Sequence, residues 1–466
     1  MQLSQTELKY AFCQLAQRAG FEEASPGNTT LQNVPVRIIY TPHQEIGDYN
    51  DQEDMIIICA AEDGAFDQLI SAPEKSLDWV PREYLLPENF DTPISNSMPI
   101  LFPVKNGVHT EAAIEKKGNI IIINFDIVSA AFFMLSRYEE YRLKLKDRYG
   151  RFPANQSIAF KQSFLKQPIV DEYAMILRAW IQYLAPSWHP QIRTGKILPT
   201  HDIDFIRTLP NLRKAARMII KESQSYDPLY AVNAVWHRWK AERSDLSKSI
   251  YIQAIEKLCT LSQQNNMKST FFFKTTPSGF FDSGYDIRHN ALKPIFTRIQ
   301  DMGFSIGLHP GFRTVQNDNK ILREKNALEA AIGHHVSECR QHYLRFQVPQ
   351  TWRKQIKAGL IVDNSLAFAE HVGFRCGTCH PYHPFDVMAQ TQLEILERPL
   401  IVMDSTLKDY MQLSVDHAEK LIGDLAYRCL KIEGDFTLLW HNTSFFNQWE
   451  EWGTRYISIL QTLSAL

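Results

Sequence analysis

The sequence predicts a two-domain α/β protein with a distorted (β/α)7-type barrel in its C-terminal part, residues 195–466. The chain has 466 residues, more than one hydrophobic core usually supports. After residue 195, apolar runs typical of strands alternate with amphipathic stretches typical of helices, as in a parallel α/β domain. About seven such units over roughly 270 residues fit a barrel better than a small open sheet.

Residues 1–190 are expected to form a smaller α/β domain. Short apolar runs predict strands there, and longer amphipathic stretches predict helices. The expected strands are VRIIY at 36–40, DMIIICA at 54–60 and GNIIIINFD at 118–126, and the expected helices are 127–144 and 171–184. The segment 185–196, APSWHPQIRTGK, interrupts this pattern and marks the predicted domain boundary.

The composition argues against several kinds of partner. The net charge of -2 and the pI near 6.7 give no global attraction to nucleic acid or to an anionic membrane. The first residues lack the pattern of a signal peptide, and no apolar run reaches the roughly 20 residues of a membrane-spanning helix. Seven cysteines, mostly in apolar contexts, fit reduced thiols. A cytoplasmic protein without a transmembrane segment is therefore expected.

In the C-terminal part, polar residues lie at the ends of several predicted strands. The strands are expected at 197–204, 269–273, 304–309, 337–343, 360–368, 393–404 and 436–441, and helices at 290–302, 319–331, 414–430 and 446–463. Because the carboxyl ends of parallel barrel strands meet at one mouth, side chains there can share a pocket although they are distant in sequence. The polar residues at these ends are His201, Asp202, Asp204, His309, Arg340, His342 and His441.

The two carboxylates of THDID, Asp202 and Asp204, are the first candidate site. Two residues apart on an extended segment, they point to the same side. Their mutual repulsion is relieved by a divalent cation, so that one carboxylate can bind metal while the other acts as a base. A turn or a helix cap after the strand is the alternative interpretation, because aspartate is common at such positions.

Two histidines at strand ends add to this hypothesis. His309 ends an apolar strand and precedes Pro-Gly, and a neutral imidazole there is a suitable zinc ligand. His441 follows the apolar run of LLWH, and its ordinary pKa would let it protonate a leaving group. Each histidine alone is equally compatible with a structural role, and Arg340 with a surface ion pair. Their occurrence together at several strand ends favours a shared site.

The segment CGTCHPYH at 376–383 allows three interpretations. The C-x-x-C-H pattern has the form of a covalent haem site, which normally requires export. Cys376, Cys379, His380 and His383 could instead bind a structural zinc ion, although four ligands in one short loop are uncommon. Ordinary loop residues are the third interpretation and the one we favour.

With these residues in place, the chain resembles the polysaccharide deacetylases of carbohydrate esterase family four, also called NodB-homology proteins. The ordered segments are THDID, GLHPGF, RQHY, a strand with Asp363, and LLWH. The family's Thr-Phe-Asp-Asp motif resembles the Asp202 and Asp204 pair, with one residue inserted between them. Its His-Ser/Thr-x-x-His motif matches at His309, whereas Arg313 occupies the position of the second histidine.

Two further family motifs are matched later in the chain. RQHY at 340–343 resembles Arg-x-Pro-Tyr/Phe, with His342 in place of the proline, and the end of LLWH resembles Leu-x-His. The chain is also similar to a divergent branch of the family with an extra N-terminal domain of no assigned activity. The segments that carry this likeness are FFMLSRYEEY (132–141), DRYGRF (147–152), IGLHPGF, RQHYLRF, DNSLAFAEHVGFRCGT (363–378) and PLIVMDSTL (399–407).

The resemblance implies metal-dependent removal of an acetyl group from an N-acetylated sugar or polysaccharide precursor. The implied ion is divalent, usually Zn2+, and the implied ligands are Asp204 and His309. Because Arg313 replaces the family's second histidine, we suggest His342 as the third ligand. The implied catalytic residues are Asp202 as the base, His441 as the general acid and Arg340 as the residue that orients Asp202. Tyr343, Arg375 and Trp440 are candidate walls of the substrate pocket, with core packing as the alternative.

Two other functions remain open at this point. The replacement at Arg313 would suit a catalytically inactive carbohydrate-binding or scaffold protein on the same barrel. A metal-dependent amidase acting on a non-sugar amide is the third hypothesis, because one fold hosts many chemistries. A cytoplasmic deacetylase would be expected to act on a precursor such as a nucleotide- or lipid-linked sugar.

Overall fold

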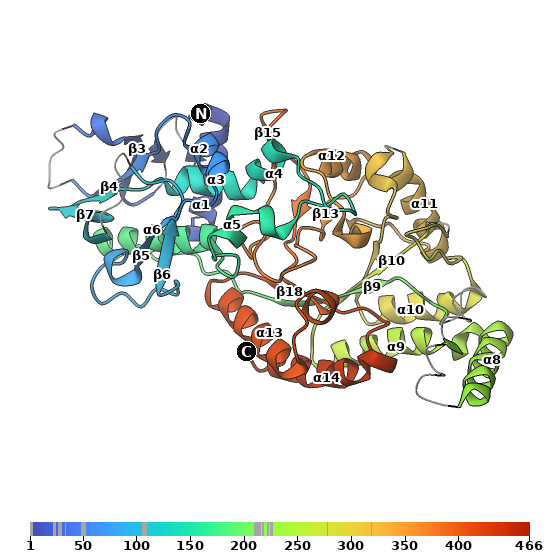
Figure 1. The fold of residues 1–466 in the computed structure, drawn as a ribbon. Coiled ribbons are helices and arrows are strands. Elements are labelled where there is room, and N and C mark those ends of the chain that lie inside the picture. The colour runs from blue at the N-terminus through green and yellow to red at the C-terminus, as the bar shows by residue number, and fades with distance from the viewer. Residues whose placement is uncertain are drawn as a thin grey trace.

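The computed structural model contains two main sheets, one in each half of the chain (Figure 1). The structure describes residues 3–21, 25–26, 30–32, 34–47, 53–104, 110–208, 216, 219–220, 223, 227–276, 278–317 and 319–466. The first sheet is built from strands between residues 25 and 123, and the second from strands between 197 and 439. None of the helices in these ranges combines the length and the apolar character that crossing a membrane would require.

The N-terminal sheet has six strands in the order β1-β2-β3-β4-β8-β7. Their bounds are β1 (Ser25–Pro26), β2 (Thr30–Gln32), β3 (Arg37–Pro42), β4 (Met55–Ala60), β7 (Ile114–Lys117) and β8 (Ile120–Ile123). The three central strands β3, β4 and β8 are parallel, and the outer pairs are antiparallel. A separate hairpin pairs β5 (Asp78–Pro81) with β6 (Ser97–Ile100). The sheet is therefore mixed.

Side-chain alternation explains how this sheet is buried on both faces. In β4, Ile56 and Ile58 belong to the main hydrophobic core, together with the apolar faces of α1 (Gln5–Ala19), α3 (Ile127–Leu135) and α6 (Ile169–Leu184). Met55, Ile57 and Cys59 point the other way, into a smaller apolar cluster. Shorter helices here are α2 (Ala65–Ser71), α4 (Tyr138–Leu143) and α5 (Ile158–Lys161).

The predicted single helix over 127–144 is wrong in one respect: it is two helices, α3 and α4. The break lies at Arg137, which adopts a left-handed φ of 52°. Its buried guanidinium is bonded to Glu139 at 2.7 Å and to Glu140 at 2.9 Å. These buried ion pairs stabilise the turn that interrupts the helix, because a buried charge must be paired.

The C-terminal sheet has eight strands in the order β16-β13-β12-β11-β10-β9-β18-β17, and every neighbouring pair is parallel. The strands are β9 (Ile197–Ile203), β10 (Thr270–Phe273), β11 (Ser305–Leu308), β12 (Glu338–Cys339), β13 (Val362–Asp363), β16 (Leu396–Glu397), β17 (Val402–Met403) and β18 (Phe436–Leu439). The expected parallel α/β arrangement is thus confirmed. A small antiparallel pair, β14 (Phe385–Asp386) and β15 (Thr391–Gln392), stands apart.

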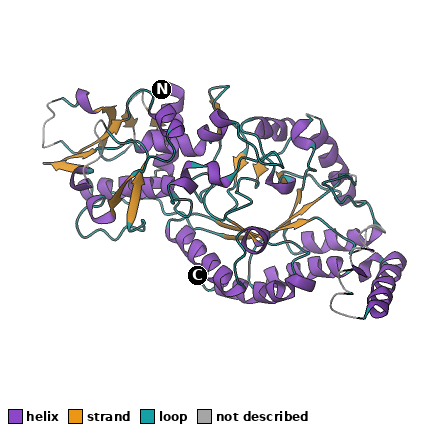
Figure 2. Cartoon of the chain, viewed as in Figure 1, coloured by secondary structure: helices purple, strands orange, loops and turns teal. Residues whose placement is uncertain are grey.

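Helices surround this sheet on its outer side (Figures 1 and 2). They are α8 (Pro228–Ser244), α9 (Ile250–Gln264), α10 (Lys293–Asp301), α11 (Lys320–Ile332), α12 (Gln350–Lys357), α13 (Val415–Lys431) and α14 (Glu450–Ser464). The four helices predicted in this half correspond to α10, α11, α13 and α14, with shifted ends.

The segment predicted as one strand at 393–404 divides into β16 and β17, which lie at opposite edges of the sheet. β16 pairs with β13, and β17 pairs with β18. Only residues 398–401 separate the two pieces, so a single short segment joins both edges and gives the sheet its barrel-like form. The strand ladders at 337–343 and 360–368 are also shorter than predicted, because the chain turns toward the cavity directly after β12 and β13.

Candidate metal and catalytic site

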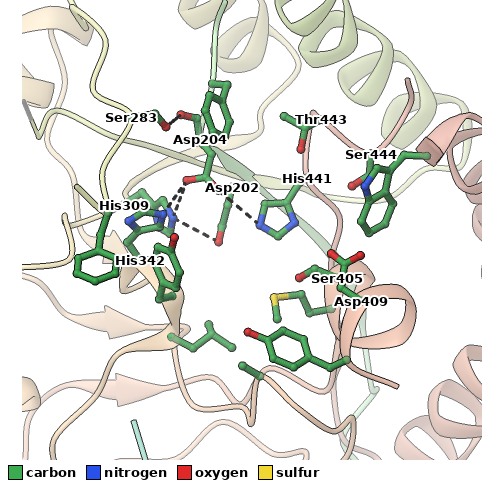
Figure 3. A pocket seen from close by; sticks show the side chains of 18 of the residues that line it. Asp202, Asp204, Ser283, His309, His342, Ser405, Asp409, His441, Thr443 and Ser444 are labelled. Atoms are coloured by element: carbon green, nitrogen blue, oxygen red, sulfur yellow. Dashed lines mark hydrogen bonds and ion pairs between the residues drawn. The ribbon is translucent and has the colours of Figure 1, made fainter. Parts of the chain in front are cut away.

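A cavity of about 350 Å³ lies at the carboxyl ends of the barrel strands. Side chains that follow β9, β11, β12 and β18 point toward one another there (Figure 3). Its polar lining is Arg151, Asp202, Asp204, Ser283, His309, His342, Ser405, Asp409, His441, Thr443 and Ser444. Its apolar and aromatic lining is Phe205, Phe281, Tyr343, Leu344, Ala369, Met403, Tyr410 and Trp449. The parallel sheet thus gathers residues that are up to 240 positions apart.

Asp204, His309 and His342 form the one cluster among the described residues whose ligand atoms are spaced to hold a metal ion. One potential ligand atom from each lies within 4.8 Å of the others. Asp204 Oδ1 is 3.4 Å from His309 Nε2 and 3.3 Å from His342 Nε2. This buried carboxylate oxygen accepts no hydrogen bond from the described residues. An oxygen in that state suits a cation, because a buried acceptor without a hydrogen bond is costly, and Lys274 Nζ lies 3.5 Å from it in an ion pair.

Hydrogen bonds fix the orientation of both imidazoles. The Nδ1 of His309 is 2.6 Å from the Arg340 carbonyl oxygen, to which its N–H donates. The Nδ1 of His342 is 2.7 Å from Asp282 Oδ1. In each ring Nε2 therefore faces Asp204 without a proton, as in metal sites where a carboxylate or carbonyl orients the ligand. Lys274 Nζ lies 3.3 Å from His342 Nε2 and occupies this side of the ring in the structure. Burial lowers the pKa of His342, despite the raising effect of Asp204, and this favours the neutral ligand form.

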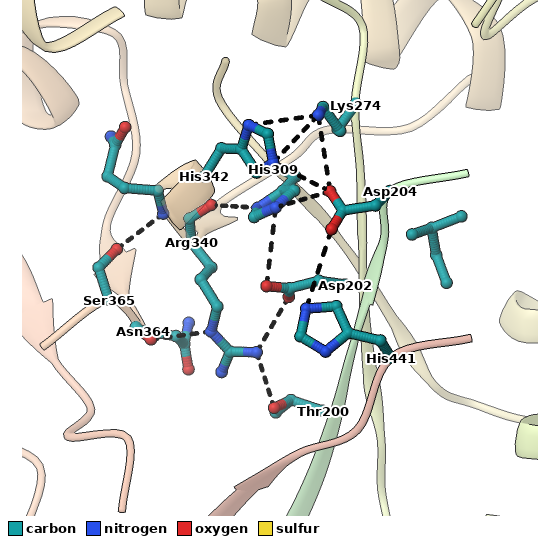
Figure 4. Close-up of polar contacts among 12 residues, drawn as sticks. Thr200, Asp202, Asp204, Lys274, His309, Arg340, His342, Asn364, Ser365 and His441 are labelled. Atoms are coloured by element: carbon teal, nitrogen blue, oxygen red, sulfur yellow. Dashed lines mark hydrogen bonds and ion pairs between the residues drawn. The ribbon is translucent and has the colours of Figure 1, made fainter. Parts of the chain in front are cut away.

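A buried lysine adjoins the cluster (Figure 4). Lys274 follows β10 and is fully buried, with Nζ 3.5 Å from Asp204 Oδ1 and 3.4 Å from Asp282 Oδ1. Burial alone would raise the pKa of Asp204, but His342, Lys274 and His309 hold it well below its usual value. Asp204 is therefore a carboxylate at any pH at which the protein would work.

Asp202 lies on the same strand as Asp204 and is held by Arg340 (Figure 4). Arg340 Nη1 donates to Asp202 Oδ1 at 3.1 Å and to Thr200 Oγ1 at 2.8 Å, and its Nε donates to the Asn364 carbonyl oxygen at 2.9 Å. The other oxygen of Asp202 is 3.7 Å from His309 Nε2. The arrangement leaves Asp202 oriented toward the metal-type cluster, where a carboxylate can accept a proton from water.

His441 faces the carboxylates from the opposite side of the cavity. Its Nε2 is 3.9 Å from Asp204 Oδ2, and its Nδ1 is 2.7 Å from Asp404 Oδ1. Asp404 also accepts hydrogen bonds from the backbone N–H of His441 and from Ser444 Oγ. Burial would lower the pKa of His441, but Asp404, with Asp202 and Asp204, raises it to about 10. The imidazole therefore carries a proton that it can donate.

Two of the predicted pocket walls are not in the pocket. Trp440 is buried and stacks on Tyr456, with ring centroids 4.6 Å apart, because adjacent residues of an extended chain point to opposite sides and His441 takes the inner one. Arg375 is buried elsewhere, with Nη2 donating to Glu140 Oε2 at 2.6 Å. Tyr343, the third candidate, does line the cavity, whereas Arg313 is exposed and does not.

The CGTCHPYH segment is an ordinary buried loop. His380 Nε2 is 2.8 Å from the Ile432 carbonyl oxygen, and His383 Nδ1 is 3.1 Å from the Ile395 carbonyl oxygen. Asp171 of α6 accepts hydrogen bonds from Thr378 Oγ1 at 2.6 Å and from the Cys379 N–H at 2.8 Å. Among the described residues this segment contributes no metal-type cluster, so the haem and structural-zinc interpretations are set aside.

Three residues of the site were missed from sequence: Lys274, Asp282 and Asp404. Lys274 directly follows the apolar run STFFF, and Asp404 ends PLIVM. Both therefore carried the signal that singled out Asp204 and His309, a polar residue at the end of an apolar strand. Asp282 lies in a long loop after β10, where no periodicity identifies it.

The comparisons with known proteins add little to this geometry. A family model, described as a family of unknown function (DUF7033), matches residues 6–186, less than half of the chain. No curated protein sequence matches the chain. The N-terminal segment thus resembles a family whose description names no activity.

Several solved structures are similar to part of the chain. A Mycobacterium smegmatis protein described as a polysaccharide deacetylase is 16% identical, with a TM-score of 0.38, and the match covers 60% of this chain and 87% of that chain. A family 4 carbohydrate esterase from Streptomyces lividans, in complex with acetate, is 12% identical, with a TM-score of 0.29 and coverages of 59% and 88%. A CE4 family pseudoenzyme from Bacillus anthracis is 11% identical, with a TM-score of 0.27 and coverages of 57% and 61%. Similarity this distant says nothing about the activity of this chain.

Proposed function

We propose that this protein is a metal-dependent hydrolase that removes the acetyl group from an N-acetylated sugar, on a distorted (β/α)7-type barrel in which the segment 393–404 counts as one of the seven strands. One observation carries the proposal. A cluster of three metal-type ligands, an oriented carboxylate and a protonated imidazole face one cavity from different strands. The sequence likeness to family-four deacetylases points the same way.

Asp204, His309 and His342 would hold the metal ion. Three protein ligands with an open position are typical of catalytic zinc sites, and for this reason we propose Zn2+. When bound, such an ion supplies Lewis-acid polarisation of the acetyl carbonyl and lowers the pKa of water. The nearby Lys274 ammonium opposes a second cation, so we expect one ion and not two.

The other side chains would move protons. Asp202, oriented by Arg340, would take a proton from the attacking water, whose oxygen joins the acetyl carbon. His441 would give its proton to the amide nitrogen as the C–N bond breaks. The products are acetate, which takes up the water oxygen, and an amine. The proton that Asp202 receives from water replaces the one that His441 gives to the amine. Leu344, Ala369 and Met403 give the cavity an apolar patch that suits the acetyl methyl group.

Metal content tests the site directly. We expect about one zinc ion per wild-type chain, measured by elemental analysis after gel filtration, in keeping with a three-ligand site. Asp204→Asn, His309→Ala and His342→Ala should each lose most of it, whereas His417→Ala, at an exposed histidine of α13, should keep it. A wild type that binds no ion under zinc-loading conditions would contradict the proposal and favour a carbohydrate-binding or scaffold protein.

Activity on acetylated sugars tests the chemistry. Acetate release from N-acetylglucosamine oligomers by zinc-loaded protein, lost in Asp202→Asn, is the expected result. Acetate release from simple non-sugar acetamides in place of sugars would favour the broader amidase hypothesis. The proposed cytoplasmic location, which we draw from the sequence, is checked by cell fractionation.

A further inference from the structure

A second cavity, of about 920 Å³, adjoins the first. Phe205, Phe281, Ser283 and Tyr343 line both, so the two cavities are neighbours across these four side chains. The second cavity extends from there to the C-terminal end of α8. A substrate whose acetylated sugar occupies the first cavity can therefore place its next chemical group in the second.

Two arginines of the second cavity are candidate ligands for an anion. Arg207 and Arg243 both line it, and His289 lies on the same wall. The guanidinium of Arg243 lies over the Trp239 ring at 4.7 Å. No ion pair among the described residues involves either arginine. Both guanidinium groups are thus available to an anionic ligand, for which arginine is well suited.

The carboxylates that line this cavity are each held by partners other than the two arginines. Glu242 accepts hydrogen bonds from the N–H and the hydroxyl of Thr208. Asp286 is paired with Arg288 at 3.2 Å. Asp282 is bonded to the ligand histidine His342 and lies 3.4 Å from Lys274.

We propose that the second cavity binds a phosphate or diphosphate group through Arg207 and Arg243. The substrate would then be an acetylated sugar esterified to an anionic carrier, and not a neutral polysaccharide. This inference rests on the proposed function, because it assumes that the sugar occupies the first cavity. The shared chemistry is a sugar phosphate ester, and its carrier is either a nucleoside or a lipid.

Aromatic and apolar side chains beyond the arginines suit either carrier. Trp236 and Trp239 stack with ring centroids 5.0 Å apart, and the Phe280 side chain on the cavity wall is 90% exposed. Along α8, Leu229, Val232 and Trp236 are also exposed, at the spacing of one helix face. A nucleobase can stack on such rings, and a hydrocarbon chain can lie along such a face.

The kinetic test compares three substrates of the zinc-loaded full-length protein. They are a uridine diphosphate N-acetylhexosamine, a polyprenyl diphosphate N-acetylhexosamine in detergent micelles, and neutral chitotetraose. We expect at least one diphosphate ester to exceed chitotetraose in kcat/KM by about tenfold or more. The double variant Arg207→Gln/Arg243→Gln should raise KM for that ester by about tenfold, with kcat and chitotetraose hydrolysis unchanged. The ester with the higher kcat/KM shows whether the carrier of the phosphate is a nucleoside or a lipid.

Arg323→Gln is the matched control, because Arg323 is an exposed arginine of α11 that does not line the cavity. It should leave KM unchanged. The inference would be overturned if neither ester exceeded chitotetraose in kcat/KM. It would also be overturned if the double variant lowered kcat/KM for all three substrates alike.

A binding measurement separates this inference from the proposed function. Calorimetric titration of zinc-loaded Asp202→Asn protein with uridine diphosphate, and with a short-chain prenyl diphosphate, needs no turnover. Binding that the double variant loses and Arg323→Gln keeps would support the anion site even if no substrate is hydrolysed. The inference would be refuted, whatever the activity, if the double variant bound both ligands as tightly as the Asp202→Asn protein does. It would also be refuted if the Asp202→Asn protein bound neither ligand.

Discussion

At the residue scale, the pair formed by Asp404 and His441 decides which proton-transfer role the cavity can support. An isolated histidine would be mostly neutral at pH 7.5, given its ordinary pKa near 6.5. Here the buried Asp404 carboxylate bonds both the ring and the backbone N–H of His441 and raises the pKa of the ring to about 10. In the proposed mechanism a histidine held in this state is the acid, and Asp202, which Arg340 orients, is the base.

Asp404→Asn should therefore shift the alkaline limb of kcat to lower pH. The folded enzyme needs His441 protonated, so kcat falls as pH rises through its pKa, and loss of the neighbouring charge lowers that pKa by about one unit or more. The pH profile of kcat from pH 6 to 10 measures the shift. Asp409→Asn removes a carboxylate from the same cavity that makes no hydrogen bond to His441, and it should move the limb less. An unchanged limb in Asp404→Asn would show that His441 is not the acid.

At the element scale, close packing of β10 against β11 supports Arg340. Gly307 of β11 faces Phe272 of β10, and a Cβ at Gly307 would lie 2.5 Å from the Phe272 ring. The Arg340 guanidinium lies over the same ring, 4.6 Å from its centroid. The absence of a side chain at Gly307 thus sets the position of Phe272, and Phe272 sets that of Arg340 and, through it, of Asp202.

Gly307→Ala should lower both stability and activity. Overpacking of this kind typically costs about 1–3 kcal/mol of unfolding free energy, because the rigid ring and the neighbouring strand must move. Urea denaturation and kcat/KM measure the two effects. Gly423→Ala, in α13 where a Cβ would meet nothing within 4 Å, is the matched control and should be neutral or slightly stabilising. Equal stability of the two variants would contradict this packing argument.

At the scale of the whole molecule, the N-terminal part and the barrel share buried polar contacts. Arg375, directly before the CGTCH loop, binds Glu140 of α4. Asp171 of α6 binds the same loop through Thr378 and Cys379. The turn of DRYGRF reaches the first cavity itself, where Arg151 is part of the lining. The N-terminal part therefore contributes to the shape of the site.

Glu172 of α6, which contacts Arg428 of α13, makes the packing of the N-terminal part on the barrel sensitive to pH. Burial raises its pKa from 4.5 to about 7, against the lowering effects of Ser95 and of Arg428 on α13. The folded state thus holds this proton more tightly than the unfolded chain. The stability that Glu172 contributes is full below about pH 4.5 and is lost as pH rises through 7, by at most roughly 3 kcal/mol.

The comparison with Glu172→Gln isolates this effect, because glutamine keeps the shape without the titration. Relative to wild type, the unfolding free energy of Glu172→Gln should rise between pH 5 and pH 8. Denaturation curves at four pH values within this range give the difference. Glu394→Gln, at an exposed carboxylate before β16, serves as the control and should show no such slope. A difference that is constant with pH would contradict the assignment.

The sequence by itself determined the alternation of strands and helices and the side chains at the strand ends. Both are local signals: apolar periodicity specifies an element, and the end of a parallel strand specifies where its next polar residue points. The gathering of Asp202, Asp204, His309, His342 and His441 into one cavity was predictable on that basis.

Only the tertiary structure decided the rest. The division of the strand at 393–404 depends on which neighbours each half meets across the barrel, and the break at Arg137 depends on buried partners. The partners of the site, Asp282 for His342 and Asp404 for His441, come from other segments, and no local pattern links them. Arg375 and Trp440 were misplaced for the same reason. Periodicity indicates that a side chain is buried, but long-range packing decides which residues it contacts.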